Sequence, residues 1–233
     1  MAEDAATFTS AGLRRGARRC LALAAASFVY GIGFGVMADH AGLALGEAVA
    51  MSALVYAGAS QVVALGMWDD PIPFLAVWLA AIAVNARYLL LGAALRPWLA
   101  GLGPGRAYLT LGLISDGTWA LALRERAASG RDAAFLVGGG LALWVAWVGS
   151  TGLGHALGAV LGAPSALGLD FLLPAFCATI AIALWRGRGD LGPLLAGGGT
   201  ALAVAALIDG PWYVVAGGAA GCLAAAAGAT HDA

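Results

Sequence analysis

The sequence predicts an all-α membrane protein with about seven or eight transmembrane helices, one or more of them broken. Of its 233 residues, 61% are hydrophobic and only 11% are charged, whereas soluble domains carry about 25% charged residues. Long stretches, for example 48–68 and 210–230, contain no charge at all. Since roughly 20 apolar residues in a helix cross the hydrocarbon core of a membrane, each such stretch can form one span.

These stretches divide the chain into eight candidate spans joined by short connections. We place the spans at roughly 20–38, 48–67, 72–94, 106–123, 133–154, 169–185, 191–208 and 211–228. The tripeptide Ala-Leu-Gly at 44–46 recurs at 166–168, an offset of 122 residues. Internal repeats are common in transporters, so this match indicates a weak internal repeat.

A basic cluster stands before the first apolar stretch and consists of Arg14, Arg15, Arg18 and Arg19. Because Lys and Arg concentrate in cytoplasmic connections, this cluster predicts a cytoplasmic N-terminus. We expect 1–18 to be a cytoplasmic tail and 19–233 to be a single transmembrane transport domain. Eight alternating spans would place Arg96 and Arg106 outside, against the same rule. The alternative is a re-entrant segment between 48 and 100.

Charge and cysteine usage exclude several classes of function. The net charge is -1, whereas a nucleic-acid-binding protein needs a basic face to replace the counterions along the phosphates. Cys20, Cys177 and Cys222 lie far apart, so we expect neither a disulfide framework nor a metal site, and no cofactor. An enzyme alternative is a rhomboid-like intramembrane serine protease, which would pair Ser60 with His155.

The second predicted span is too polar for a plain membrane anchor. Ser52, Tyr56 and Ser60 recur every four residues, so they would line one face of a continuous helix, and Gln61 adds an amide at the same depth. With Gly58 between them, these residues predict a helix that bends or unwinds beside a small solute.

The first span contains the glycine series Gly31, Gly33 and Gly35. No strand precedes it, so it is not a dinucleotide-binding fingerprint. We expect either close helix packing or an unwound segment there.

Two further spans carry polar and charged residues within apolar surroundings: Asn85 and Arg87 in one, and Asp116 in the other. A charge at membrane depth must lie near a surface, be paired or face a cavity. Arg87 could therefore extend to the membrane surface or pair with Asp116. Asp116 could form that pair, meet a substrate ammonium group or carry a coupled proton.

Several motifs together resemble the AzlC family, and the resemblance covers most of the chain. They are the series 28–35, 41–43 with 47–48, 51–52, Tyr56-Ala-Gly-Ala-Ser-Gln61, Asn85-Ala-Arg87-Tyr88 and the mid-span Asp116. The resemblance implies a bacterial inner-membrane permease, mostly described as an exporter of leucine, isoleucine, valine or methionine. It also implies a proton gradient as the driving force and a much smaller membrane protein of the AzlD type as an obligate partner.

Two positions depart from the pattern of this family. Gly117 stands where the family tends to have an acidic residue, and Tyr88 stands where it often has histidine. These departures concern the coupling ion and the substrate preference.

The expected substrate-binding residues are Tyr56, Gly58, Ser60, Gln61, Asn85, Arg87 and Asp116. Arg87, or backbone N–H groups at a broken helix near Gly31 or Gly58, would bind the carboxylate of an amino acid. Asp116 would bind the ammonium group or carry the coupled proton. A passive channel for small polar solutes is the remaining alternative.

Overall fold

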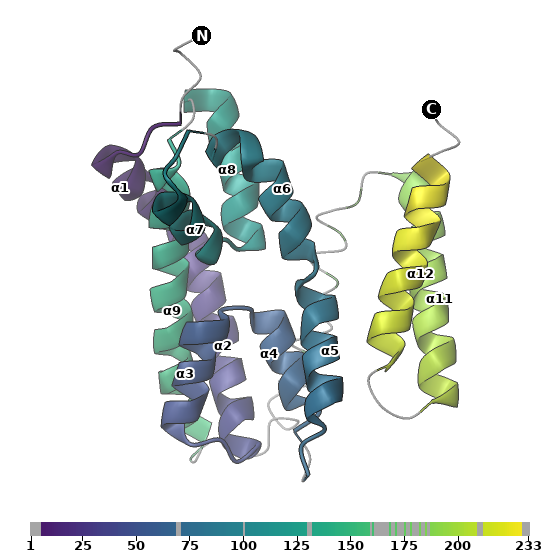
Figure 1. Cartoon of the computed structure of the whole chain (residues 1–233). Coiled ribbons are helices and arrows are strands. Elements are labelled where there is room, and N and C mark those ends of the chain that lie inside the picture. Colours follow the sequence, from purple (N-terminus) through teal and green to yellow (C-terminus); the bar gives the residue numbers. More distant parts are fainter. Residues whose placement is uncertain are drawn as a thin grey trace. The chain divides into compact units, whose positions relative to one another are not determined.

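The computed structural model describes residues 6–68, 71–99, 101–129, 132–158, 187–208 and 212–229, with isolated residues between 160 and 185. Within these residues every regular element is a helix (Figure 1). The predicted all-α fold class is therefore confirmed. Four of the described helical segments are long and apolar enough to cross a membrane: Leu21–His40, Phe74–Arg96, Ala134–Gly158 and Arg188–Leu207.

The chain divides into two compact units. Unit 1 comprises Met1–Gly58 and Arg87–Leu169, and unit 2 comprises Ala59–Ala86 and Asp170–Ala233. The helices of unit 1 are α1 (Ser10–Arg19), α2 (Leu21–His40), α3 (Leu45–Val55), α6 (Arg87–Leu99), α7 (Pro104–Gly112), α8 (Asp116–Ser129) and α9 (Ala134–Gly158). Unit 2 holds α4 (Gly58–Leu65) after its first residue, α5 (Phe74–Asn85), η3 (Arg188–Asp190), α11 (Leu191–Leu207) and α12 (Trp212–Ala229).

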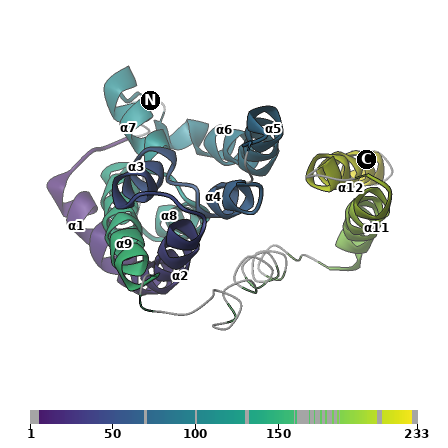
Figure 2. The same ribbon diagram turned by 90° about the horizontal axis from the view of Figure 1, so that it is seen from below.

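Helix α9 is the centre of unit 1, and α1, α2 and α3 all pack against it (Figure 2). The glycines of α2 make the α2–α9 contact close, because a side chain at Gly31 would overlap Ser150 and one at Gly35 would overlap the backbone at Thr151. Small residues at such contacts let two helices approach in a membrane. Helix α2 is continuous through this series. The packing interpretation is confirmed, and the alternative of an unwound segment near Gly31 is wrong.

Three consecutive predicted spans are each divided into two helices. The break in 48–67 falls at 56–57 and the break in 106–123 at 113–115. In 72–94 the two helices are separated by Ala86 alone, whose backbone stays in the α region, so that interruption is a kink within the segment Phe74–Arg96. The prediction of broken helices is confirmed, whereas the expectation that Ser52, Tyr56 and Ser60 share one continuous helix face is wrong. The span predicted at 169–185 falls mostly outside the described residues, and so does the second copy of the predicted repeat, at 166–168.

The remaining predicted spans correspond to single helices. The stretch 20–38 forms α2 and 133–154 forms α9, while 191–208 and 211–228 form α11 and α12. In unit 2, α11 and α12 pack closely through glycines, since a Cβ at Gly197 would lie 3.0 Å from the carbonyl oxygen of Gly217. Large aliphatic side chains on this pair, such as Leu202 and Leu223, are exposed, as lipid-facing residues are.

Candidate functional site

The break between α3 and α4 is set by Tyr56, which adopts the left-handed conformation with φ 46° and ψ 40°. A residue with a Cβ is disfavoured there by roughly 1–2 kcal/mol. The side chain holds the conformation in place, because the Tyr56 hydroxyl donates a hydrogen bond of 3.2 Å to the carbonyl of Gly140 on α9. Helix α3 therefore ends within the polar stretch noted in the sequence, between Ser52 and Ser60.

The other two breaks bring two charged residues together within unit 1. Arg87 is the first residue of α6 and Asp116 is the first residue of α8, and Arg87 Nη2 lies 3.2 Å from Asp116 Oδ2. Their side chains are 28% and 34% exposed, so the pair is partly accessible. Of the alternatives that the sequence left open for Arg87, the structure shows the ion pair.

Helix dipoles act differently on the two members of this pair. The N-terminus of a helix carries a partial positive charge, which stabilises a carboxylate and disfavours a cation. Asp116 is therefore well placed at the start of α8, whereas at Arg87 the negative C-terminal end of α5, one residue earlier, offsets the positive end of α6. Asp116 compensates the positive charge of Arg87, and a further anion bound at Arg87 would do the same.

Arg87 uses only part of its hydrogen-bonding capacity. Its Nε atom is buried and has no hydrogen-bond partner among the described residues. The guanidinium carbon lies 5.3 Å from the ring centroid of Tyr88, which orients the guanidinium group over an aromatic face. A planar guanidinium with a free Nε can accept a second, bidentate carboxylate partner.

The position of Asp116 is fixed by a hydrogen-bonded turn at the start of α8. The Ser115 N–H donates to Thr118 Oγ1 at 2.8 Å, and the Thr118 N–H donates to Ser115 Oγ at 3.3 Å. A serine at the N-cap satisfies the otherwise unpaired N–H groups of the first turn. Asp116 therefore projects from a rigid helix start and not from a mobile loop.

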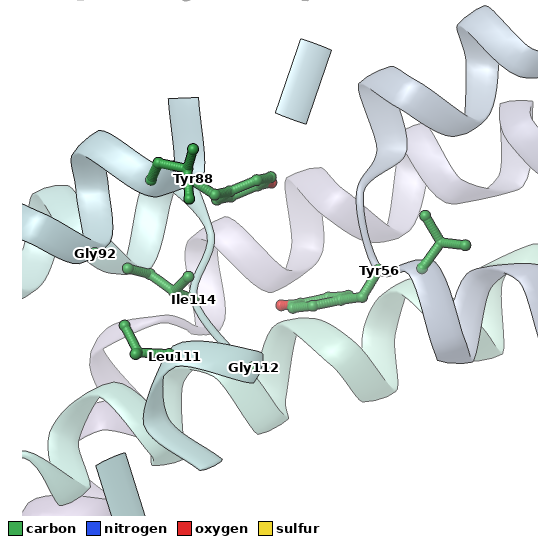
Figure 3. A pocket seen from close by; sticks show the side chains of 8 residues that line it. Tyr56, Tyr88, Gly92, Leu111, Gly112 and Ile114 are labelled. Atoms are coloured by element: carbon green, nitrogen blue, oxygen red, sulfur yellow. The ribbon is translucent and has the colours of Figure 1, made fainter. Parts of the chain in front are cut away.

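A cavity of about 390 Å³ lies beside this pair, within unit 1 (Figure 3). It is lined by Val55, Tyr56, Tyr88, Leu89, Gly92, Leu111, Gly112 and Ile114. The rings of Tyr56 and Tyr88 extend into it from opposite sides (Figure 3). Its volume falls in the usual range for small-molecule sites, about 300–1,000 Å³.

The two features are joined through neighbouring residues. Tyr88 lines the cavity and also lies under the Arg87 guanidinium, while Ile114 lines it two residues before Asp116. Tyr88 and Ile114 also belong to an apolar cluster with the buried Leu95. The arrangement combines a charged pair with an open, mostly apolar cavity.

Three of the predicted site residues do not belong to unit 1, which holds the Arg87–Asp116 pair and the cavity. Ser60, Gln61 and Asn85 belong to unit 2. Ser60 and Gln61 are buried, and Asn85 Nδ2 donates to Ser60 Oγ at 3.1 Å. The Oδ1 atom of Asn85 is buried with no hydrogen-bond partner among the described residues, so this pair retains an unused acceptor.

Gly58 serves close packing in unit 1. A Cβ at this position would come within 2.8 Å of the Trp147 ring and 3.1 Å of the Tyr30 ring. These two aromatic rings pack against each other with centroids 5.4 Å apart. The glycine therefore allows α4 to begin directly against this aromatic pair.

Polar residues near the opposite end of α9 are engaged in structural contacts. His155 Nε2 lies 2.7 Å from the Leu43 carbonyl oxygen and 3.7 Å from Asp39 Oδ1. Glu47 accepts a hydrogen bond of 2.8 Å from the Ala44 N–H and so caps α3.

Among the described residues, no group of three or more His, Cys, Asp or Glu could hold a metal ion.

Sequence reasoning missed most of the cavity wall. Leu111, Gly112 and Ile114 are ordinary residues of an apolar stretch, and nothing in the sequence marks them as lining a cavity. A signal for the nearby break did exist, because Ser115 followed by Asp116 and Thr118 is typical of a helix start.

Comparisons with known proteins point in one direction. The family model described as "AzlC protein" matches residues 22–161, which is more than half of the chain. "Inner membrane protein YgaZ" of Escherichia coli (strain K12) is 29% identical over 225 residues, covering 93% of this chain and 90% of that protein. No solved structure matches the chain.

Proposed function

The chain belongs to the AzlC protein family, and on this premise we propose that it exports the amino acids leucine, isoleucine, valine and methionine. The similarity to YgaZ and the apolar helices indicate a multi-pass inner-membrane protein with a role in membrane transport. In the proposal the N-terminus is cytoplasmic, the proton gradient drives export, and the chain is the large subunit of a carrier with a small AzlD-type membrane protein.

The observation that carries the proposal is the Arg87–Asp116 pair beside an apolar cavity. An amino acid is a zwitterion with a side chain, so its binding site needs a cation for the carboxylate, an anion for the ammonium group and a cavity for the side chain. The free Nε of Arg87 favours a carboxylate at one end. Asp116 can receive the ammonium group at the other end.

The cavity suits an aliphatic side chain. Its lining consists of apolar and aromatic residues, with two glycines, Gly92 and Gly112. A methylene group in such a pocket is worth only about 1–3 kcal/mol of discrimination. The four proposed substrates should therefore compete with one another, while charged amino acids should be excluded by the cost of burying a charge.

Asp116 also provides a route for proton coupling. Its ionised form holds Arg87, and protonation of the carboxylate would remove that attraction and free the guanidinium. The pair would then alternate between a closed arrangement and one in which substrate groups or a proton take the place of the partner. Such a pair, located at two helix starts, can couple proton movement to small rotations of α6 and α8.

The protease alternative gains no support from the contacts of its two residues. Ser60 Oγ accepts a hydrogen bond from the Asn85 amide, and His155 Nε2 contacts a backbone carbonyl. A serine nucleophile instead requires a hydrogen-bonded general base. No specific observation favours this function over transport.

Efflux of labelled leucine from preloaded proteoliposomes tests the proposal, with and without an AzlD-type partner, under an imposed proton gradient. Partner-dependent efflux that follows the gradient is the expected result. Efflux down the leucine gradient alone, with no dependence on the proton gradient, would indicate a passive channel. No efflux of any of the four amino acids under either condition would overturn the assigned substrate class.

A further inference from the structure

The N-terminal helix α1 is docked onto the protein through its glycine face. A Cβ at Gly12 would overlap the Asp132 carboxylate, and a Cβ at Gly16 would overlap the carbonyl of Phe135 at the start of α9. Both glycines are buried, and they are four residues apart, so they lie on the same side of the helix. This face of α1 is fully occupied.

A polar cluster fixes the beginning of α1 as well. Asp132 accepts hydrogen bonds from the hydroxyl of Thr9 and, at 3.2 Å, from its N–H. Arg15 Nε lies 2.8 Å from Glu125 Oε1, and Arg15 Nη2 lies 3.9 Å from Asp132 Oδ2. Arg15 is therefore neutralised by acidic residues of unit 1, and α1 is held in one orientation.

The other arginines of α1 have no such compensation. Arg14, Arg18 and Arg19 are exposed, and within the described part of the chain no acidic residue pairs with them. Arg14 and Arg18 lie about 200° around the helix from Gly12 and Gly16, so they point away from the docked face. The helix dipole accounts for arginines in the last turn, at 18 and 19, but not for Arg14.

The location of α1 places these charges at the membrane surface. Only Cys20 separates it from α2, the candidate span that begins at Leu21. Leu21 is 62% exposed and Val29 is 68% exposed, as expected for residues facing lipid. Three uncompensated cations at the end of a span lie at the depth of the phospholipid headgroups.

We propose that Arg14, Arg18 and Arg19 form a binding site for the phosphate groups of anionic phospholipids, with α1 lying against the membrane surface. The charges are complementary, and the docking of α1 through its glycine face leaves Arg14 and Arg18 on the opposite side of the helix, while Arg19 is exposed as its last residue. Arginine forms strong, paired hydrogen bonds with phosphate oxygens. The bound lipid would hold α1 against unit 1 from the side that the protein leaves open.

Native mass spectrometry of the purified full chain, titrated with phosphatidylglycerol and with phosphatidylcholine, tests this site. An arginine near an anionic surface contributes about a fivefold change in binding. We therefore expect wild type to retain phosphatidylglycerol preferentially, and Arg14→Gln and Arg18→Gln each to weaken this retention about fivefold. The triple variant with Arg14, Arg18 and Arg19 changed to lysine should keep most of it, because the charge is preserved.

Two controls separate this site from a general effect of charge. Arg96→Gln and Arg188→Gln each remove an exposed arginine outside α1 and should leave lipid retention unchanged. Equal losses in these controls, or equal retention of both lipids by wild type, would overturn the proposal. Displacement of the lipid by millimolar inorganic phosphate would also contradict it, because the site would then recognise free phosphate and not the membrane.

Discussion

Arg87 and Asp116 are the first residues of two different helices, α6 and α8, and their side chains meet at 3.2 Å beside the apolar cavity. The relationship depends on two helix breaks, since continuous spans would present these residues on helix sides and not at helix starts. A charge pair at two helix starts can open with only a small rotation of either helix. In the proposed function, this pair is where a zwitterionic substrate binds.

Asp116→Asn should abolish gradient-driven transport while leaving membrane insertion intact. Losing one hydrogen bond to a charged group costs about 1.5–3 kcal/mol, which corresponds to a loss of substrate affinity of about tenfold or more. The measurement is leucine efflux from proteoliposomes at matched protein content. Asp39→Asn is the matched control, because the Asp39 side chain is 27% exposed and lies by His155, outside the cavity lining. Wild-type rates in Asp116→Asn would remove this carboxylate from the mechanism.

Arg87→Lys should weaken substrate binding although it preserves the charge. Lysine lacks the planar fork and the Nε donor that is free in Arg87. One lost hydrogen bond to a charged group corresponds to about 1.5–3 kcal/mol, so the half-saturating leucine concentration should rise about tenfold or more. Arg124→Lys, on the exposed side of α8, should leave it unchanged. If the half-saturating leucine concentration of Arg87→Lys is as unchanged as that of Arg124→Lys, then Arg87 contributes only its positive charge.

The sequence allowed the fold class and one of the three breaks to be predicted, for identifiable reasons. Apolar composition follows directly from the membrane environment, so the span positions are visible in the sequence. The break at Tyr56 is surrounded by hydroxyls, small residues and a glycine, which together disfavour a lipid-facing helix. The glycines of α2 could be interpreted either as packing or as unwinding, because both uses require the absence of a side chain.

The break before Asp116 has a local signal, the helix start at Ser115, whereas the interruption at Ala86 and the cavity wall depend on tertiary contacts that no local pattern reveals. Ala86 is a good helix former, yet the helix is interrupted there, between Asn85, which bonds Ser60, and Arg87, which pairs with Asp116. The cavity residues Leu111 and Ile114 are distinguished only by the partners that folding brings near them. A single sequence does not encode these neighbours in a local pattern.

The left-handed backbone at Tyr56 can be tested with two small substitutions. Gly adopts this conformation without steric cost, whereas a residue with Cβ is disfavoured by roughly 1–2 kcal/mol. Tyr56→Gly should therefore be more stable than Tyr56→Ala by about 1 kcal/mol or more in chemical denaturation of the purified protein. In a continuous helix the order would be reversed, because Gly is about 1 kcal/mol less favourable than Ala. The sign of this difference thus decides whether the helix is broken at Tyr56.

The size of the cavity should set the substrate preference, and Gly92 is the position that tests it. A Cβ there would lie 3.6 Å from Leu111 Cδ2, an ordinary contact, so a larger side chain would extend into the space that the cavity provides. Gly92→Leu should reduce transport of leucine and isoleucine more than transport of valine, because each methylene that no longer fits costs about 1–3 kcal/mol. Competition of unlabelled amino acids against labelled valine measures the preference. Gly149→Leu adds the same side chain on α9, at a glycine with nothing within 4 Å, and should not alter it. An unchanged order of preference in Gly92→Leu would show that the substrate side chain occupies another part of the protein.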